Sequence, residues 1–273
     1  MSVFARPISS VDKPPSRLMF ILEGMRVAPE FAMMVAAMPL LARAPSGDGH
    51  PVLVLPGLMG SDGSTVALRT YLARQGFTPH GWGFGRNRGY RPGLEVDLAA
   101  KLESLANEGK RKVSLVGWSL GGIFARQLAK ARPDLVRQVI TLGSPFKGPP
   151  TATNAWRLYE LASGMRIDEL ESHPFVRDRA SPPDVPTTAI LSRTDGVCAW
   201  RNCAEQESES AETIEIYGSH CGLGHNPAAM YAISDRLAQT EGNWEKFSPP
   251  ERLVAAFPKS RRHALDNRDA VSA

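Results

Sequence analysis

The sequence predicts an α/β protein with a mostly parallel central sheet flanked by helices, a helical cap insertion and an N-terminal helical extension. From His50 onward, short apolar runs alternate with amphipathic segments of helical periodicity. Strands separated by helices pair in parallel, and the helices then cover both faces of the sheet. The runs are continuous, as in Val52-Leu53-Val54-Leu55, which is typical of strands buried on both faces.

The expected elements follow from this alternation, with glycine and proline marking the ends of several segments. Strands are expected at residues 52–55, 77–82, 113–116, 136–142, 187–192 and 213–217. Core helices are expected at residues 64–75, 94–108, 120–131 and 228–239.

The N-terminal extension is expected to cover residues 1–46. Residues 1–16 have the composition of a loose arm, and residues 17–43 predict one or two helices. Proline lacks an N–H and obstructs a helix interior, so a break is expected near Pro29 and an end near Pro39.

The alternation stops between Gly143 and Pro186, where helical segments are bounded by paired prolines. More than 40 residues exceeds the usual length of a connection, which favours a cap or lid at residues 146–185. An ordinary crossover with one long loop is the alternative. The core is then formed by residues 47–145 and 186–245, and residues 246–273 form a C-terminal tail.

Composition excludes several classes of protein. Lys plus Arg is 32 and Asp plus Glu is 28, so the net charge of +4 is too small to predict nucleic-acid binding. An odd number of cysteines, Cys198, Cys203 and Cys221, is not a disulfide framework and lacks the spacing of a metal site. Reduced thiols in a cytoplasmic protein are expected, with a Cys198–Cys221 pair as the alternative.

The start of the chain does not have the pattern of a signal peptide, because residues 1–15 contain charges and prolines and no apolar run follows a basic start. Residues 31–41 are eleven residues without a charge, whereas a membrane-spanning helix needs about 20. We therefore expect a cytoplasmic protein, with peripheral membrane contact or a homodimer through residues 17–43 as further expectations.

The motif that carries chemistry is Gly117-Trp118-Ser119-Leu120-Gly121, between an apolar strand and an amphipathic helix. A serine nucleophile needs a sharp strand-to-helix turn, and glycines on either side let neighbouring chains approach closely. The turn also places Ser119 at a helix N-terminus, whose dipole favours an oxyanion. Ser119 is therefore the predicted nucleophile.

With this motif the chain resembles the α/β-hydrolase family, in particular its lipase and esterase branch, over roughly residues 50–239. The resemblance implies the α/β-hydrolase fold and two backbone N–H donors to an oxyanion. One would be Leu120, after the nucleophile, and the other Leu58, with Met59 as the fallback. Many relatives have His-Gly in this early loop, where the chain has Pro56-Gly57.

The family's chain order, nucleophile then acid then histidine, implies Asp195 as the acid after a late strand and His220 as the base. A plain Asp-Gly turn is the alternative for Asp195. His225 is the alternative base, although the family's Gly-x-His pattern fits His220. The expected substrate-binding residues are Met59, Trp118, Trp156 and Tyr159, and further residues of the cap, Leu158 and Leu161, would help to line an acyl pocket.

Together these residues predict a serine hydrolase that cleaves carboxylic esters with an apolar acyl part through a Ser-His-Asp triad and an acyl-enzyme. The expected substrate is a small-molecule ester or lipid, and no cofactor or metal is expected. An acyltransferase or thioesterase with the same triad is an alternative. A non-catalytic hydrolase-like binding protein at a membrane surface is another.

Overall fold

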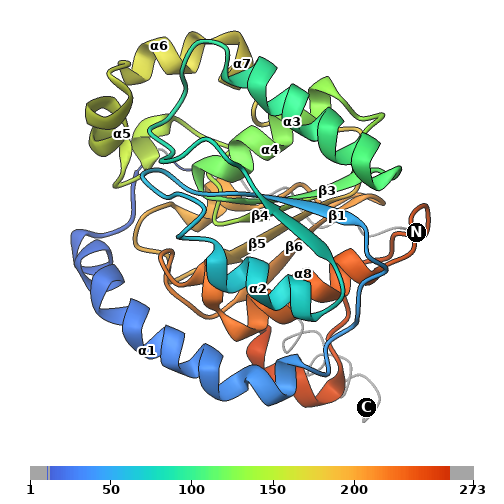
Figure 1. The fold of residues 1–273 in the computed structure, drawn as a ribbon. Helices are drawn as coiled ribbons and strands as arrows, with labels where there is room; N and C mark the ends of the chain where they lie inside the picture. Colours follow the sequence, from blue (N-terminus) through green and yellow to red (C-terminus); the bar gives the residue numbers. More distant parts are fainter. Residues whose placement is uncertain (1–10, 12, 259–273) are drawn as a thin grey trace, which may run out of the picture.

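A computed structural model describes residue 11 and residues 13–258 of the chain. Within them, six strands form one sheet in the order β2-β1-β3-β4-β5-β6 (Figure 1). Each pair of neighbouring strands is parallel. The strands are β1 (Pro51–Leu55), β2 (Thr78–Gly81), β3 (Val113–Trp118), β4 (Val136–Leu142), β5 (Thr187–Ser192) and β6 (Ala211–Ile216). The predicted mostly parallel sheet is confirmed.

Helices cover both faces of the sheet, as Figure 1 shows. One layer contains α3 (Leu94–Gly109) and α4 (Leu120–Ala131), and the opposite layer contains α1 (Arg17–Leu41), α2 (Val66–Arg74) and α8 (Pro227–Ala238). Successive strand residues point to opposite faces. Val52 and Val54 of β1 accordingly pack in the cluster with α2 and α8, whereas Leu53 and Leu55 pack in the cluster with α3 and α4.

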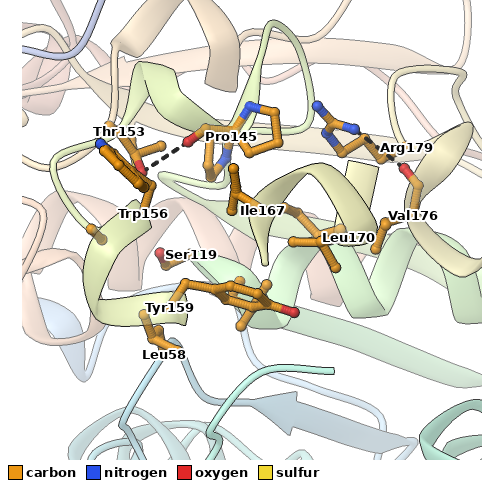
Figure 2. Close-up of a pocket in the computed structure, with 15 residues that line it drawn as sticks. Leu58, Ser119, Pro145, Thr153, Trp156, Tyr159, Ile167, Leu170, Val176 and Arg179 are labelled. Atoms are coloured by element: carbon orange, nitrogen blue, oxygen red, sulfur yellow. Dashed lines mark hydrogen bonds between the residues drawn. The ribbon is translucent and has the colours of Figure 1, made fainter. Parts of the chain in front are cut away.

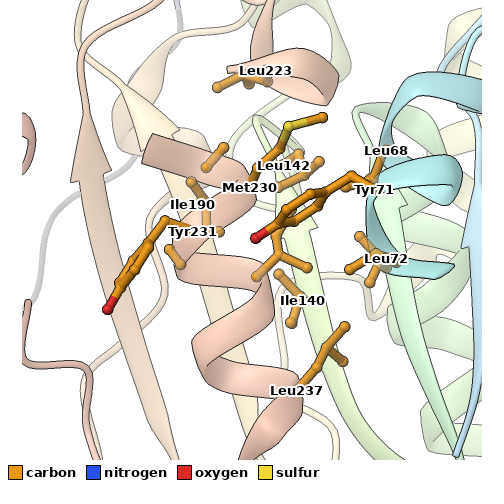
Figure 3. Packing of buried hydrophobic residues seen from close by; sticks show 14 of the residues in the cluster. Leu68, Tyr71, Leu72, Ile140, Leu142, Ile190, Leu223, Met230, Tyr231 and Leu237 are labelled. Atoms are coloured by element: carbon orange, nitrogen blue, oxygen red, sulfur yellow. The ribbon is translucent and has the colours of Figure 1, made fainter. Parts of the chain in front are cut away.

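Figure 3 shows how the first of these clusters is filled. Tyr71 and Leu72 of α2 and Met230 of α8 meet Ile140 and Leu142 of β4. All five side chains are almost completely buried. Apolar burial of this kind is the main favourable term in folding, and it fixes the sheet that positions the loops at its carboxyl edge.

The N-terminal segment forms one helix where a break was expected. α1 runs without interruption from Arg17 to Leu41 and contains both Pro29 and Pro39. The expected break near Pro29 is wrong. Buried side chains on both sides of this proline, Glu23 before it and Glu30 and Met34 after it, hold the helix against the body. These contacts outweigh the one backbone hydrogen bond that proline removes.

Short helices occupy the stretch between β4 and β5 where the alternation stops. They are the 3₁₀ helix η1 (Pro150–Ala152) and the helices α5 (Trp156–Ser163), α6 (Ile167–Ser172) and α7 (Pro174–Arg177). Figure 1 shows α5, α6 and α7 together at one end of the molecule, on the side of the sheet that carries α3 and α4. The expected limits of the cap, core and tail stay predictions.

The remaining described elements are three short 3₁₀ helices: η2 (Trp200–Cys203), η3 (Leu223–His225) and η4 (Glu251–Ala256). Phe257, directly after η4, is buried and packs against Phe247 at a ring-centroid distance of 4.8 Å. The first part of the expected tail is therefore anchored to the core. Parts of the expected arm and tail lie outside the described residues. They include residues 1–10 and 12 of the arm and residues 259–263 of the tail, a run rich in basic residues.

A membrane-crossing helix requires both length and sustained apolarity. In the part of the chain that the structure describes, none of the helices combines the two.

Candidate active site

Ser119 occupies a strained turn between β3 and α4. Its backbone angles are φ 53° and ψ −120°, a conformation that residues with a side chain rarely adopt. The turn depends on close approach of neighbouring backbone. A Cβ added to Gly117 would lie 2.4 Å from the Cα of Gly122, and one added to Gly121 would lie 2.4 Å from the carbonyl oxygen of Leu55. The sequence therefore has glycine on both sides of the serine for steric reasons.

Asp195 and His220 meet at the same edge of the sheet. Asp195 follows β5 and His220 follows β6, and Oδ2 of Asp195 lies 2.6 Å from Nδ1 of His220. The other carboxylate oxygen, Oδ1, accepts the N–H groups of Val197 at 2.8 Å and Cys198 at 2.7 Å. A carboxylate can only accept, so the imidazole carries its proton on Nδ1 and leaves Nε2 free to act as a base.

Electrostatics at this pair favour a charged imidazole. Burial alone disfavours the imidazolium, but the adjacent Asp195 carboxylate, with Cys198 acting in the same direction, outweighs it and raises the pKa of His220 well above its usual value. Cys198 lies beside the ring as a buried thiol. Burial raises the pKa of that thiol well above its usual value, which favours its neutral form.

The loop after β1 approaches the serine from the other side. A Cβ added to Gly57 would lie 3.2 Å from the Cβ of Ser119. The backbone N–H of Met59, the fallback oxyanion donor, is already donated to the carbonyl of Asn87 at 2.6 Å. Leu58 and Leu120 line a pocket together with Ser119. The geometry thus favours Leu58 over Met59 as the donor opposite Leu120.

Asn87 lies in the glycine-rich loop at residues 81–89, which the sequence predicts to line the active-site face with Arg86 or Asn87 in contact with substrate, but Asn87 lines neither of the two pockets at Ser119. Its side chain is completely buried. Nδ2 donates to the carbonyl of Pro56 at 2.8 Å, Oδ1 accepts the N–H of Gly89 at 3.1 Å, and its backbone N–H is donated to Gly60 at 2.7 Å. Asn87 braces the loop at residues 56–60.

The alternative histidine lies elsewhere. His225 belongs to η3, and its ring contacts Phe31 of α1 at a centroid distance of 5.7 Å. His220, in contrast, lines a pocket with Ser119. All three cysteines of the chain are free, so the alternative Cys198–Cys221 pair is not formed.

One group of potential metal ligands occurs among the described residues. Donor atoms of Asp195, Cys198 and His220 lie within 4.8 Å of one another. A metal-bound cysteine is a thiolate, and the raised pKa of Cys198 opposes that form. The carboxylate and the imidazole are already paired with each other, so these residues fit an acid–base pair better than a metal site.

Two pockets meet at Ser119. The first has an empty volume of about 630 Å³, part of it open to solvent, and is walled by the short helices between β4 and β5. Figure 2 shows Trp156, Tyr159, Ile167 and Leu170 around the cavity that Ser119 also lines. Two residues expected to bind substrate, Trp156 and Tyr159, therefore line this first pocket.

The second pocket contains His220. It has an empty volume of about 860 Å³, and Phe20, Trp118, Leu158 and His220 are among its lining residues. Trp118, another residue expected to bind substrate, also donates its indole N–H to the carbonyl of His220 at 3.1 Å.

Two of the residues expected to bind the substrate or line its acyl pocket are absent from both linings. Met59 lines neither the first nor the second pocket, because its neighbours Leu58 and Gly60 face them instead. Leu161 is 83% exposed and points away from both. An acyl-binding role for Leu161 does not fit this placement.

Comparison with known proteins gives matches to parts of the chain. A family model described as a PGAP1-like alpha/beta domain matches residues 96–194. A triacylglycerol lipase of Burkholderia plantarii is 31% identical over 138 residues, which is 46% of this chain and 38% of the lipase. A triacylglycerol lipase of Pseudarthrobacter phenanthrenivorans is 33% identical over 108 residues, 36% of this chain and 34% of that lipase. The chain thus spans less than two fifths of the length of either relative.

Among solved structures, Aspergillus fumigatus lipase B superposes with a TM-score of 0.53 at 18% identity, covering 71% of this chain and 53% of the lipase. Such a likeness concerns the fold. Together with the parallel sheet and the strained serine turn, these matches lead to one conclusion. The chain has the α/β-hydrolase fold and resembles the lipase- and esterase-like branch of that superfamily.

Proposed function

We propose that the protein is a serine hydrolase that cleaves carboxylic esters with an apolar acyl part. The observation that carries the proposal is the 2.6 Å contact between Asp195 and His220, in a pocket that His220 shares with the strained Ser119. A nucleophile, a base and a residue that orients the base are the three parts of a serine hydrolase. The similarity to triacylglycerol lipases supports the same reaction class.

The mechanism follows from the placement of protons. His220 keeps Nδ1–H on Asp195 and accepts the Ser119 Oγ proton at Nε2 while Oγ attacks the ester carbonyl carbon. The carbonyl oxygen becomes an oxyanion, which the N–H groups of Leu58 and Leu120 stabilise. His220 then donates its proton to the leaving alcohol, and the acyl-enzyme remains on Ser119. Water, deprotonated by His220, attacks the acyl-enzyme and releases the acid.

The alcohol part and the acyl part of the substrate are assigned to different pockets. Since His220 must protonate the leaving oxygen, the alcohol part belongs in the second pocket, which His220 lines. The acyl part then belongs in the first pocket, against Trp156, Tyr159 and Leu170. This makes residues 146–185, the proposed cap, the part of the chain that determines acyl length. Hydrolysis and acyl transfer differ only in whether water or another acceptor attacks.

We propose that the outer face of α1 contacts a lipid surface. Leu18, Ile21 and Met25 are 67%, 68% and 72% exposed. Phe20 of the same helix and Leu158 of α5 are 43% and 45% exposed and also line the second pocket. An apolar surface on the helix that also contributes Phe20 to the pocket would bring a lipid ester in a bilayer close to the site.

Substitution of the nucleophile or the base should abolish ester hydrolysis. S119A and H220Q are expected to lower kcat/KM on p-nitrophenyl esters by at least about 10⁴-fold, while a fluorophosphonate probe labels wild type at Ser119. H80Q is the matched control, because His80 lies in β2 and lines neither pocket. Wild-type turnover in folded S119A would contradict the mechanism.

The pH dependence follows from the raised pKa of His220. Only the neutral imidazole can accept the serine proton, so kcat/KM should fall as the pH drops through that pKa. The acid limb is expected above about 6.5, the ordinary value for histidine. D195N removes the carboxylate that raises the pKa, so its limb should move to lower pH and its kcat should fall by about 10⁴-fold. An identical limb in D195N and wild type would refute the pairing.

Filling the first pocket should shorten the preferred acyl chain. Leu170 is buried in that pocket, and the larger ring in L170W would occupy its volume. The ratio of kcat/KM for long-chain to short-chain p-nitrophenyl esters is expected to fall about tenfold or more. L161W, at an 83% exposed position of α5, is the control and should keep the wild-type ratio. An unchanged ratio in L170W would place the acyl chain elsewhere.

Polar substitution of the outer face of α1 tests the lipid contact. The triple variant L18S/I21S/M25S should float less with liposomes than wild type, because these exposed side chains would enter the bilayer interface. Hydrolysis of a short, soluble ester should stay at the wild-type rate. Equal flotation of both proteins would contradict the lipid contact. It would also be contradicted if light scattering showed that wild type is a dimer and the triple variant a monomer.

A further inference from the structure

α1 crosses the loops that carry the acid and the base. Its two glutamates, Glu23 and Glu30, are seven residues apart and therefore lie on one face, since a helix has 3.6 residues per turn. Both are buried, with exposures of 3% and 7%. A buried carboxylate is costly unless it is hydrogen-bonded, so the partners of these two side chains indicate what they do.

Glu23 connects the acid loop to the base loop. Its Oε1 accepts the backbone N–H of Gly196, directly after Asp195, at 2.7 Å and that of His220 itself at 3.0 Å. Its Oε2 accepts the N–H of Cys221 at 2.9 Å. One carboxylate thus holds together the two backbone segments that carry the 2.6 Å pair.

Glu30 fixes the other end of the histidine loop. It accepts the backbone N–H of Ser219 at 2.8 Å and the hydroxyl of Ser219 at 2.5 Å. That hydroxyl oxygen in turn accepts the N–H of Gly222 at 2.9 Å. Arg26, which lies 3.5 Å from Glu30, donates to the carbonyl of Thr194 at 2.8 Å and to its hydroxyl at 3.0 Å. Both loops are therefore bound to the same helix face.

The glycines of the two loops match this close packing. A Cβ added to Gly196 would lie 2.3 Å from the backbone oxygen of Met19, and one added to Gly222 would lie 1.6 Å from Oε2 of Glu30. Gly222 has φ −89°, a value that any residue adopts. Its lack of a side chain is thus explained by the approach of α1 and not by backbone strain.

We propose that Glu23 and Glu30 are positioning residues, which hold Asp195 and His220 at the separation that proton transfer requires. The inference rests on the triad of the proposed function and adds α1 to it. Neither glutamate lines the two pockets, so both act through His220 and its neighbours. The carboxylate is needed because both of its oxygens accept. In the isosteric E23Q, an amide NH₂ replaces one of the two accepting oxygens. This NH₂ must face at least one backbone N–H donor, so that hydrogen bond cannot form.

The test compares E23Q and E30Q with wild type on a short, soluble ester. Loss of positioning should lower kcat about 10- to 100-fold, with KM within about twofold, at a temperature where circular dichroism shows all variants folded. The acid limb of kcat/KM should also move to lower pH, because a looser Asp195–His220 contact stabilises the imidazolium less. V35Q, at a 54% exposed position of α1, is the control. Wild-type kcat and acid limb in both variants would overturn the inference.

A second set of variants does not depend on E23Q folding well. G222A introduces a methyl group where Oε2 of Glu30 lies and should lower kcat as E30Q does. In the E30A background the carboxylate is absent, so adding G222A should lower kcat little further. The double-mutant cycle should therefore show strong coupling between positions 30 and 222. Additive effects of the two substitutions on kcat would contradict the contact between Glu30 and residue 222.

The two proposals fail in different ways. If wild type is not labelled by the fluorophosphonate at Ser119, the proposed function is wrong. If wild type is labelled and E23Q, E30Q and G222A are labelled equally fast, only the positioning role of α1 is wrong.

Discussion

The hydrogen bond between Asp195 and His220 is the interaction on which the chemistry of the site depends, and the sheet is what makes it available. β5 and β6 are adjacent and parallel, with their last residues, Ser192 and Ile216, in register. The loops that follow therefore leave the sheet side by side, with the acid three residues beyond one strand and the histidine four beyond the other. Ser119 leaves the same edge at the end of β3, so the three groups converge without any long connection.

The convergence also has to be rigid, because a short contact between a carboxylate and an imidazole is lost by small movements of either loop. The structure supplies restraints from several directions. Trp118 donates to the carbonyl of His220 from the nucleophile strand, and Asn87 braces the loop opposite the serine. In the positioning scheme that we propose, Glu23 adds a third restraint from α1. Fixed donors and acceptors of this kind lower the reorganisation that charge development requires.

Local steric rules and chain order were sufficient to predict much of the fold and the candidate site. The turn at Ser119 is a local feature, and its glycines are required by contacts within a few residues or with the next strand. Asp195 and His220 were implied by the resemblance to the α/β-hydrolase family, whose chain order places the acid and the histidine after two late strands. The contacts of α1 could not be predicted, since Glu23 meets His220 across 197 positions of sequence. α1 also has an inverted pattern: the glutamates point inward and Leu18, Ile21 and Met25 point outward, whereas charge normally indicates the solvent face.

If Ser119 is the nucleophile, the acyl group of the substrate is bound to Ser119 during each turnover, and this intermediate can be trapped. Wild-type protein would be mixed with a p-nitrophenyl ester, quenched in acid within the first turnover, and mapped by peptide mass spectrometry. The acyl mass is expected on the peptide that contains Ser119, in an amount matching the burst of p-nitrophenol. Turnover without an acyl group on that peptide, or an acyl group on a different residue, would contradict this role of Ser119.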